Sequence, residues 1–182
     1  MIRFAVSAAI VLTIATTGVL FAQEKTPTAQ IKRGEYLVTI GSCHDCHTPL
    51  TKGPNGPTPD MSRALSGHPQ DIKVNAPAST SGPWIGAFSS TLTAWSGPWG
   101  ISFSANLTPD PETGVLSDFT EQQFIRTMRT GRHQGQGRPI LPPMPWQFVG
   151  KMTDDDLKAV FAYLRQIPAI KNKVPDPIPP AE

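Results

Sequence analysis

Both cysteines of the chain, Cys43 and Cys46, lie in the segment CHDCH, which ends in His47. Two thiols separated by two residues can add to the two vinyl groups of one porphyrin, and the adjacent imidazole can then bind its iron. The segment therefore predicts one covalently attached haem c, bound through Cys43 and Cys46, with His47 as an iron ligand. His44, inside the segment, is interpreted as a solvent-facing spacer.

Other roles for this pair of cysteines explain fewer of its residues. A disulfide between Cys43 and Cys46 would close a loop too short to constrain much of the unfolded chain. A thioredoxin-like dithiol would follow a strand, whereas the preceding QIKRGEYLVTIG has helical spacing. A zinc site would need another ligand from the distant His68 or His133. Haem attachment is the interpretation that uses both thiols and the imidazole together.

The sixth iron ligand decides between carrying electrons and binding small molecules, because a methionine closes the iron and raises its reduction potential. Met144 is favoured, since three prolines lie within four positions of it in RPILPPMPW and stiffen an extended loop. Met152 is instead expected to pack against Leu157. The alternatives for the sixth ligand are Met152, His68 and His133.

Three helices are expected to position these residues. The spacing of apolar residues predicts a helix over residues 30–41, leading directly into the haem segment. A capping box that begins at Thr120 opens a second helix, which Gly131 ends. Thr153 opens a third helix, and Pro168 is expected to end it. With 182 residues, 20 prolines and 15 glycines, the chain is expected to form one domain rich in loops.

Two segments lack a helical pattern. Residues 48–100 are rich in glycine and proline and are expected to form a long irregular insertion that can hold a short β-hairpin around residues 85–105. Residues 168–182 are rich in proline and are expected to form an extended strap or a loose end. Three of the four tryptophans lie in the insertion and are expected to pack there: Trp84, Trp95 and Trp99.

Residues 1–22 are typical of an export signal, with Arg3 before the apolar run FAVSAAIVLTIATTGVL. Cleavage is expected after Ala22, and the alternative is an uncleaved anchor that tethers the protein to a membrane. The protein is therefore expected in the periplasm or on the periplasmic face of the inner membrane. Its formal net charge of +2 gives no case for a nucleic-acid partner.

The order of CHDCH, ANLTPDPETGVLSDFTEQQF, RTGRHQGQGRPILPPMPW and MTDDDLKAVFAYLRQIP resembles class I c-type cytochromes. Among them it is similar to the cytochrome c domains in cytochrome subunits of bacterial membrane-bound alcohol dehydrogenases. The resemblance implies a mainly α, cytochrome c-like helical fold around one haem, over residues 23–167. It also implies that Met144, the methionine of Pro-Met-Pro-Trp, is the distal haem ligand.

The predicted function is electron transfer between redox proteins by cycling of iron between Fe(III) and Fe(II), without catalysis by the chain itself. The expected partners are a dehydrogenase, another cytochrome or a terminal oxidase. One alternative is an electron-accepting subunit of a periplasmic dehydrogenase complex, and another is a haem enzyme or gas sensor with an open sixth site. Arg132 and Arg138 are candidate partners of the haem propionates, and Arg126 and Arg129 could steer an acidic redox partner.

Overall fold

The computed structural model describes residues 26–74 and 83–180 of the chain, which hold five α-helices and two small antiparallel sheets. The predicted export signal or anchor, residues 1–22, lies outside the described residues. In chain order the elements are α1 (Pro27–Ile40), α2 (Cys43–His47), β1 (Leu50–Gly53), β2 (Gly56–Pro59), η1 (Met61–Arg63), β3 (Ala87–Phe88), β4 (Ala94–Gly97), β5 (Gly100–Phe103), α3 (Glu121–Thr130), η2 (His133–Gly135), α4 (Trp146–Val149) and α5 (Asp154–Leu164).

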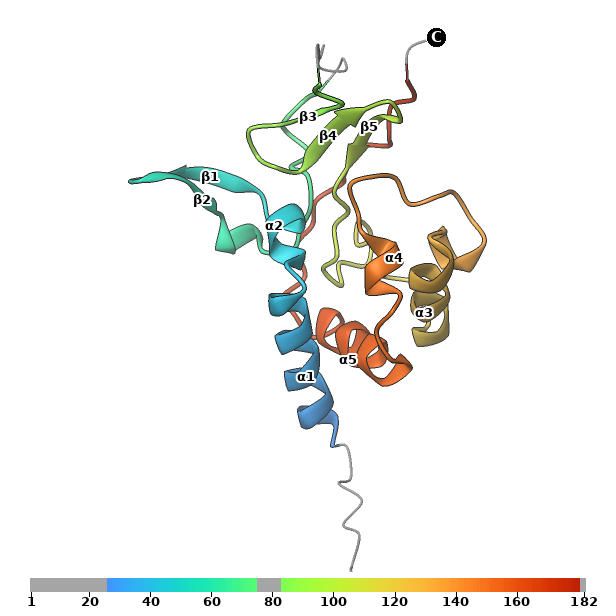
Figure 1. Ribbon diagram of the computed structural model, residues 1–182. Coiled ribbons are helices and arrows are strands. Elements are labelled where there is room, and N and C mark those ends of the chain that lie inside the picture. The colour runs from blue at the N-terminus through green and yellow to red at the C-terminus, as the bar shows by residue number, and fades with distance from the viewer. Residues whose placement is uncertain (1–25, 75–82, 181–182) are drawn as a thin grey trace, which may run out of the picture.

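The first and last helices, α1 and α5, pack directly against each other (Figure 1). Gly34 permits this contact, because a Cβ atom at Gly34 would clash with the backbone of Ala159 in α5. The predicted first helix is confirmed, and it begins three residues earlier than expected. Thr26 caps it by accepting a hydrogen bond of 3.2 Å from the Ala29 N–H, and Pro27 fits the first turn.

The predicted second and third helices are confirmed as α3 and α5. The Thr120 hydroxyl accepts a hydrogen bond from the Gln123 N–H, the Gln123 side chain accepts one from the Thr120 N–H, and α3 ends at Gly131 with a φ of 65°. Thr153 caps α5 in the same way. The third helix ends at Leu164, four residues before Pro168, so it stops a turn earlier than the proline requires.

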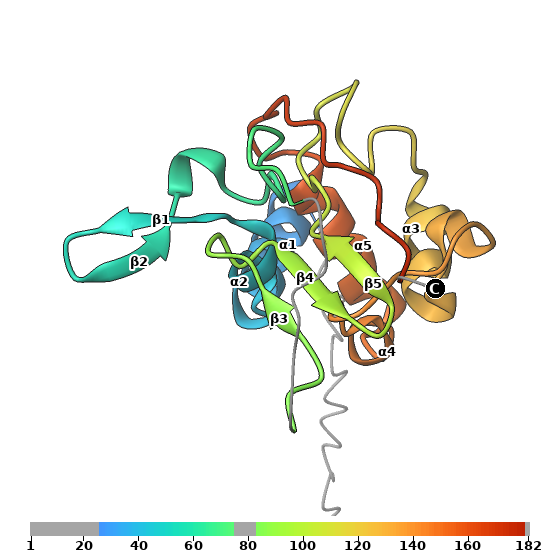
Figure 2. The same cartoon turned by 90° about the horizontal axis from the view of Figure 1, so that it is seen from above.

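The insertion is more regular than expected, so the predicted mainly α class is corrected to a mixed structure. The expected hairpin near residues 85–105 is present as β4 and β5, and β3 adds a third strand. A second hairpin, β1 paired with β2, was not predicted, because prolines in a candidate strand argue against sheet pairing. This hairpin projects from the body of the molecule in both views, and prolines are tolerated where no further strand is added (Figures 1 and 2).

The tail forms a strap rather than a loose end. Residues 168–180 run extended beside the body, and Ile178 exchanges two backbone hydrogen bonds of 2.8 and 3.0 Å with Ile101 of β5 (Figure 2). Trp84 is 73% exposed, so the expectation that it packs in the insertion is wrong. No helix in the described ranges is both long and apolar enough to cross a membrane.

The hydrophobic core lies between α1, α3 and α5. Phe124 of α3 and Phe161 of α5 contact each other, with ring centroids 5.4 Å apart. The buried core cluster consists of Leu37, Val38, Leu65, Leu116, Phe124, Ile125, Met128, Leu157, Ala159, Val160 and Leu164. The side chains of Cys43 and Met144 pack at its margin, so the two halves of the predicted site border the same core.

Candidate haem site

The CHDCH segment, which is predicted to bind haem, forms the short helix α2 directly after α1. Ser42 adopts a left-handed conformation with a φ of 55°, which redirects the chain between the two helices. Cys43 and Cys46 are not joined by a disulfide, and both are partly buried. Burial raises the pKa of the Cys43 thiol to about 11, so this thiol is protonated at neutral pH. A protonated thiol supplies both the sulfur and the hydrogen that add across a vinyl group.

His47 is fixed by one hydrogen bond. Its side chain is 8% exposed, and its Nδ1–H donates to the carbonyl oxygen of Ala105 over 2.8 Å. Because Nδ1 carries the proton, Nε2 holds a lone pair that can bind iron. Burial also lowers the pKa of His47, which keeps the imidazole neutral. The ring therefore has the tautomer and the charge state that an iron ligand needs.

A buried polar network supports the Ala105 carbonyl. Asn106, the next residue, is almost fully buried and accepts hydrogen bonds of 3.0 and 2.7 Å from the backbone N–H and hydroxyl of Thr108. Its side-chain amide donates to the carbonyl of Ile170 over 2.8 Å. Neither Ala105 nor Asn106 is recognisable as a site residue from the sequence alone. A backbone carbonyl has no side-chain signal, and the Asn-Leu-Thr-Pro-Asp segment was the nearest available marker.

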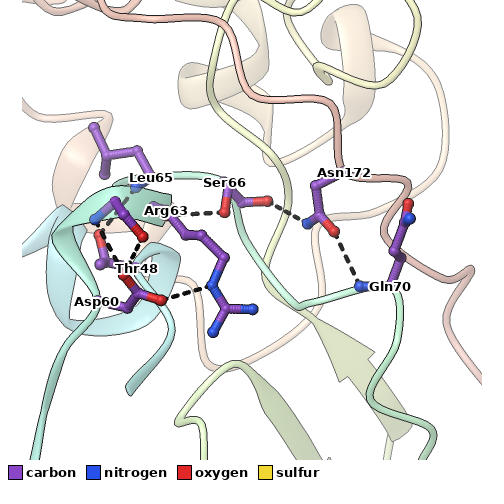
Figure 3. A network of polar contacts seen from close by, with 8 residues as sticks. Thr48, Asp60, Arg63, Leu65, Ser66, Gln70 and Asn172 are labelled. Carbon is purple, nitrogen blue, oxygen red and sulfur yellow. Dashed lines mark hydrogen bonds and ion pairs between the residues drawn. The ribbon is translucent and has the colours of Figure 1, made fainter. Parts of the chain in front are cut away.

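Thr48 joins the haem-binding segment to the loop that follows η1. Its hydroxyl oxygen accepts a hydrogen bond of 2.9 Å from the Leu65 N–H (Figure 3). The same hydroxyl contacts Nδ1 of His44 at 2.9 Å. His44 is therefore half-buried and bonded within the protein, which corrects the expectation of a solvent-facing spacer. Through Thr48, these bonds connect His44 of α2 to Leu65 of the insertion.

Asn172 ties the C-terminal strap to the same loop. It is 7% exposed, and its amide donates to the carbonyls of Ser66 and His68 over 2.7 and 2.9 Å. Its side-chain oxygen accepts a hydrogen bond of 2.9 Å from the Gln70 N–H. Figure 3 shows Asn172 between Ser66 and Gln70. The strap is thus hydrogen-bonded to residues 66–70 of the insertion.

Met144 lies half-buried in the loop between η2 and α4, and packs against the core cluster. Before Met144, the carbonyl of Pro142 accepts a hydrogen bond of 2.5 Å from the Ser102 hydroxyl of β5. After Met144, the ring of Trp146 lies so close to Gly131 that a Cβ atom there would clash with it. The loop is therefore held on both sides of the thioether.

The other candidates for the sixth iron ligand are His68, Met152 and His133, and they differ in their contacts. His68 is fully buried, and both ring nitrogens are engaged, Nδ1 with the Thr93 hydroxyl and Nε2 with the Ile72 carbonyl, each at 2.9 Å. His68 is therefore not available to iron. Met152 packs against the core cluster that contains Leu157, as expected. His133 lies half-buried in η2 and stays an alternative.

The arginines of this region differ in their contacts. Arg132 and Arg138 are both exposed in one turn, where Arg132 donates to the Gly137 carbonyl over 3.0 Å. Arg129 pairs with Asp154 at 2.5 Å and so links α3 to the start of α5. In the described ranges, no group of three or more His, Cys, Asp and Glu residues could hold a metal ion, so the zinc alternative finds no ligand set there.

No family model matches the chain, but known proteins do. It is 30% identical over 175 residues to the cytochrome c subunit of the alcohol dehydrogenase (quinone) of Gluconobacter oxydans, which covers 93% of this chain and 28% of the relative. The chain is homologous to this cytochrome c subunit over most of its own length. It is also 29% identical over 142 residues to the gluconate 2-dehydrogenase cytochrome c subunit of Pantoea cypripedii, covering 78% of this chain and 24% of the relative.

A third relative is the fructose dehydrogenase cytochrome subunit of Gluconobacter japonicus, 28% identical over 153 residues, or 81% of this chain and 24% of the relative. The predicted resemblance to such subunits is confirmed. The chain spans about a quarter of the length of the curated relatives that it matches. The homology and the pair Cys43 and Cys46 imply covalent haem c, and the protonated thiol and neutral His47 fit that group.

Proposed function

We propose that this cytochrome c domain is an electron carrier with one haem c, attached through Cys43 and Cys46 and ligated by His47 and Met144. The observation that carries the proposal is the hydrogen bond from His47 to Ala105, because it leaves Nε2 for the iron. When bound, the haem supplies a reversible one-electron change at iron.

The chain contributes rigidity and burial. The loop around Met144 is held at Pro142 and at Trp146, so the thioether needs no large rearrangement when the charge of the iron changes. A sixth position filled by a protein side chain leaves no place for oxygen or a substrate. This arrangement favours electron transfer over a haem enzyme or a gas sensor.

The proposed electron donor is a dehydrogenase. The relatives named above are cytochrome subunits of alcohol, gluconate and fructose dehydrogenases, and this domain would accept electrons in a similar setting before passing them to another cytochrome or a terminal oxidase. The setting would be the periplasm, with residues 1–22 as export signal or inner-membrane anchor. The haem domain would span residues 23–167, followed by the tail at residues 168–182.

Arg132 and Arg138 keep their proposed role as partners of the haem propionates. Both are exposed in the turn that precedes the Met144 loop, and guanidinium groups are strong donors to carboxylates. Arg126 is also exposed and is the arginine that fits the steering of an acidic partner. Arg129, which pairs with Asp154, fits a structural role better.

Mass spectrometry combined with a redox titration tests the proposal. The exported protein should carry the mass of one covalent haem and should titrate as a one-electron couple. The variant Cys43→Ser with Cys46→Ser should lose the covalent mass, whereas Asp45→Asn, at an exposed position of the same segment, should keep it. A wild-type protein without covalent haem, or with more than one, would contradict the proposal.

A further inference from the structure

A short loop of the insertion, residues 66–68, contacts both His47 and the carbonyl group that orients it. In this Gly67 loop, the Gly67 N–H donates a hydrogen bond of 2.8 Å to the backbone carbonyl of His47. A Cβ atom on Gly67 would come within 2.6 Å of the Ala105 carbonyl oxygen, which accepts the hydrogen bond from the His47 side chain. Gly67 therefore lies against the proposed iron ligand and against its hydrogen-bond acceptor.

Glycine is the residue that fits this position. Gly67 has a φ of 77°, in the left-handed region that glycine adopts freely and that other residues rarely adopt. A side chain here would also press against the backbone of Ser104 and Ala105. The position of the Ala105 carbonyl thus depends on the close approach of the Gly67 loop.

Two backbone hydrogen bonds join this part of the insertion to the segment that contains Ala105. The His68 N–H donates to the Ser104 carbonyl, and the Leu107 N–H donates to the Leu65 carbonyl, each over 2.9 Å. The bonded residues Ser104 and Leu107 lie on either side of Ala105 in the chain. A displacement of the Gly67 loop is therefore transmitted to the Ala105 carbonyl.

The C-terminal strap is bonded to both of these segments. The Asn172 amide donates to the two carbonyls that flank Gly67, over 2.7 and 2.9 Å, and Figure 3 shows the first of these bonds. Asn106, which follows Ala105, donates to the strap carbonyl of Ile170 over 2.8 Å. Both asparagine side chains are buried. The strap thus holds the Gly67 loop and the Ala105 segment together.

We infer that Gly67 and Asn172 are positioning residues for the proposed iron ligand His47. Asn172 holds the Gly67 loop, and this loop holds the Ala105 carbonyl at hydrogen-bonding distance from Nδ1 of His47. The inference rests on the proposed function, since it requires that His47 bind iron. A hydrogen bond from Nδ1–H makes an imidazole a stronger electron donor, which stabilises Fe(III) over Fe(II). The strap therefore lowers the reduction potential, although it lies far from His47 in the sequence.

Asn172→Ala tests the inference, because it removes the donor to the two carbonyls and leaves the Gly67 loop itself unchanged. Lys173→Ala is the matched control, since Lys173 is an exposed neighbour on the strap. Thr120→Ala is a second control: it removes the cap of α3, which lies away from α2 in both views, and so destabilises the protein elsewhere (Figures 1 and 2).

The readouts are the reduction potential of the holoprotein and the exchange of the His47 Nδ1–H in D₂O, followed by NMR of the reduced ¹⁵N-labelled protein. In Asn172→Ala the potential should be higher than in the wild type, and the Nδ1–H should exchange faster. Gly67→Ala should change both in the same direction, because its Cβ displaces the Ala105 carbonyl. Neither control should raise the potential or speed the exchange.

A folded Asn172→Ala protein with the potential and exchange rate of the wild type would overturn the inference. An equal rise of the potential in Thr120→Ala would also overturn it, because the effect would then follow general destabilisation. Rapid exchange of the His47 Nδ1–H in the wild type would do so even if a variant fails to fold. In each case, methionine ligation and a one-electron couple in the wild type leave the proposed electron carrier standing, and their loss would remove the proposed function itself.

Discussion

His47 shows how a backbone group decides the chemistry of a side chain. The imidazole has two nitrogens with similar proton affinity, and the Ala105 carbonyl at 2.8 Å can only accept, so it assigns the proton to Nδ1. Burial disfavours the charged form and lowers the pKa of His47. The polypeptide thus prepares a neutral ring whose Nε2 can bind iron.

In His68, by contrast, both ring nitrogens are hydrogen-bonded within the protein. The Ile72 carbonyl accepts from its Nε2–H, and the Thr93 hydroxyl donates to its Nδ1, so the neutral ring is fully bonded. Burial lowers the pKa of His68 from its ordinary value of 6.5. Of the two histidines, one keeps a nitrogen for a ligand, whereas the other links loops of the insertion.

The lowered pKa of His68 predicts a loss of stability at acidic pH. Near and below pH 6.5 the unfolded chain binds a proton at this residue more readily than the folded protein does, so the free energy of unfolding should fall as the pH drops from 7.5 to 5.5. Urea unfolding at the two pH values measures this fall. It should be smaller in His68→Gln, and an equal fall in both proteins would refute the assignment.

At the scale of the elements, the contact of α1 with α5 depends on Gly34. The two helices approach so closely that the backbone of Ala159 occupies the space of a side chain. Gly34→Ala should therefore lower the free energy of unfolding by about 1–3 kcal/mol, despite the better helix propensity of alanine.

Chemical denaturation of the holoprotein measures this change. Lys32→Ala, at an exposed position of the same helix, is the control and should stay within about 0.5 kcal/mol of the wild type. A Gly34→Ala protein as stable as the control would show that the two helices can separate slightly without cost.

Elements with strong local signals could be predicted from the sequence, and those set by distant contacts could not. The capping box at Thr120 and the glycine at Gly131 define α3 within a few residues of chain. The hairpin of β1 and β2 carries prolines that argue against a strand, and the four-residue helix α4 is too short for a periodic pattern. Their form depends on the surrounding structure.

The same distinction between local signals and distant contacts applies to the candidate site. Cys43, Cys46 and His47 stand together in the sequence, so their chemistry could be inferred from spacing alone. The Ala105 carbonyl accepts a hydrogen bond from His47 across 58 residues of sequence, and no local pattern reveals that contact. The ligand role of Met144 remains a prediction that its rigid loop supports.

At the scale of the whole molecule, buried polar side chains organise the loops. A protein with so much irregular backbone must satisfy many buried N–H and C=O groups without helices or sheets. Asn106 and Asn172 do so where the insertion, the segment after β5 and the C-terminal strap meet. The strap therefore contributes to the fold, although its sequence has no apolar periodicity.

Asn172→Ala should release the strap. The carbonyls of Ser66 and His68 would lose their donor inside the protein, at a cost of about 1–3 kcal/mol for an unpaired buried group. Hydrogen exchange of the Ile178 amide, which bonds to Ile101, should become faster. Lys173→Ala, an exposed neighbour on the strap, should leave the exchange rate unchanged. Unchanged exchange in Asn172→Ala would show that the strap is held by other contacts.

We propose that two side chains of this protein, His47 and Met144, occupy both axial positions of one haem iron. Absorption spectra of the oxidised and reduced holoprotein, before and after carbon monoxide, test it most directly when wild type, Met144→Ala and the control Met152→Ala are compared. Wild type and the control should show low-spin spectra with the ferric sulfur-to-iron band and no response to carbon monoxide, whereas Met144→Ala should lose the band and bind the gas. A wild type that is high-spin or binds carbon monoxide readily, or a Met144→Ala protein that behaves as the wild type does, would contradict the account.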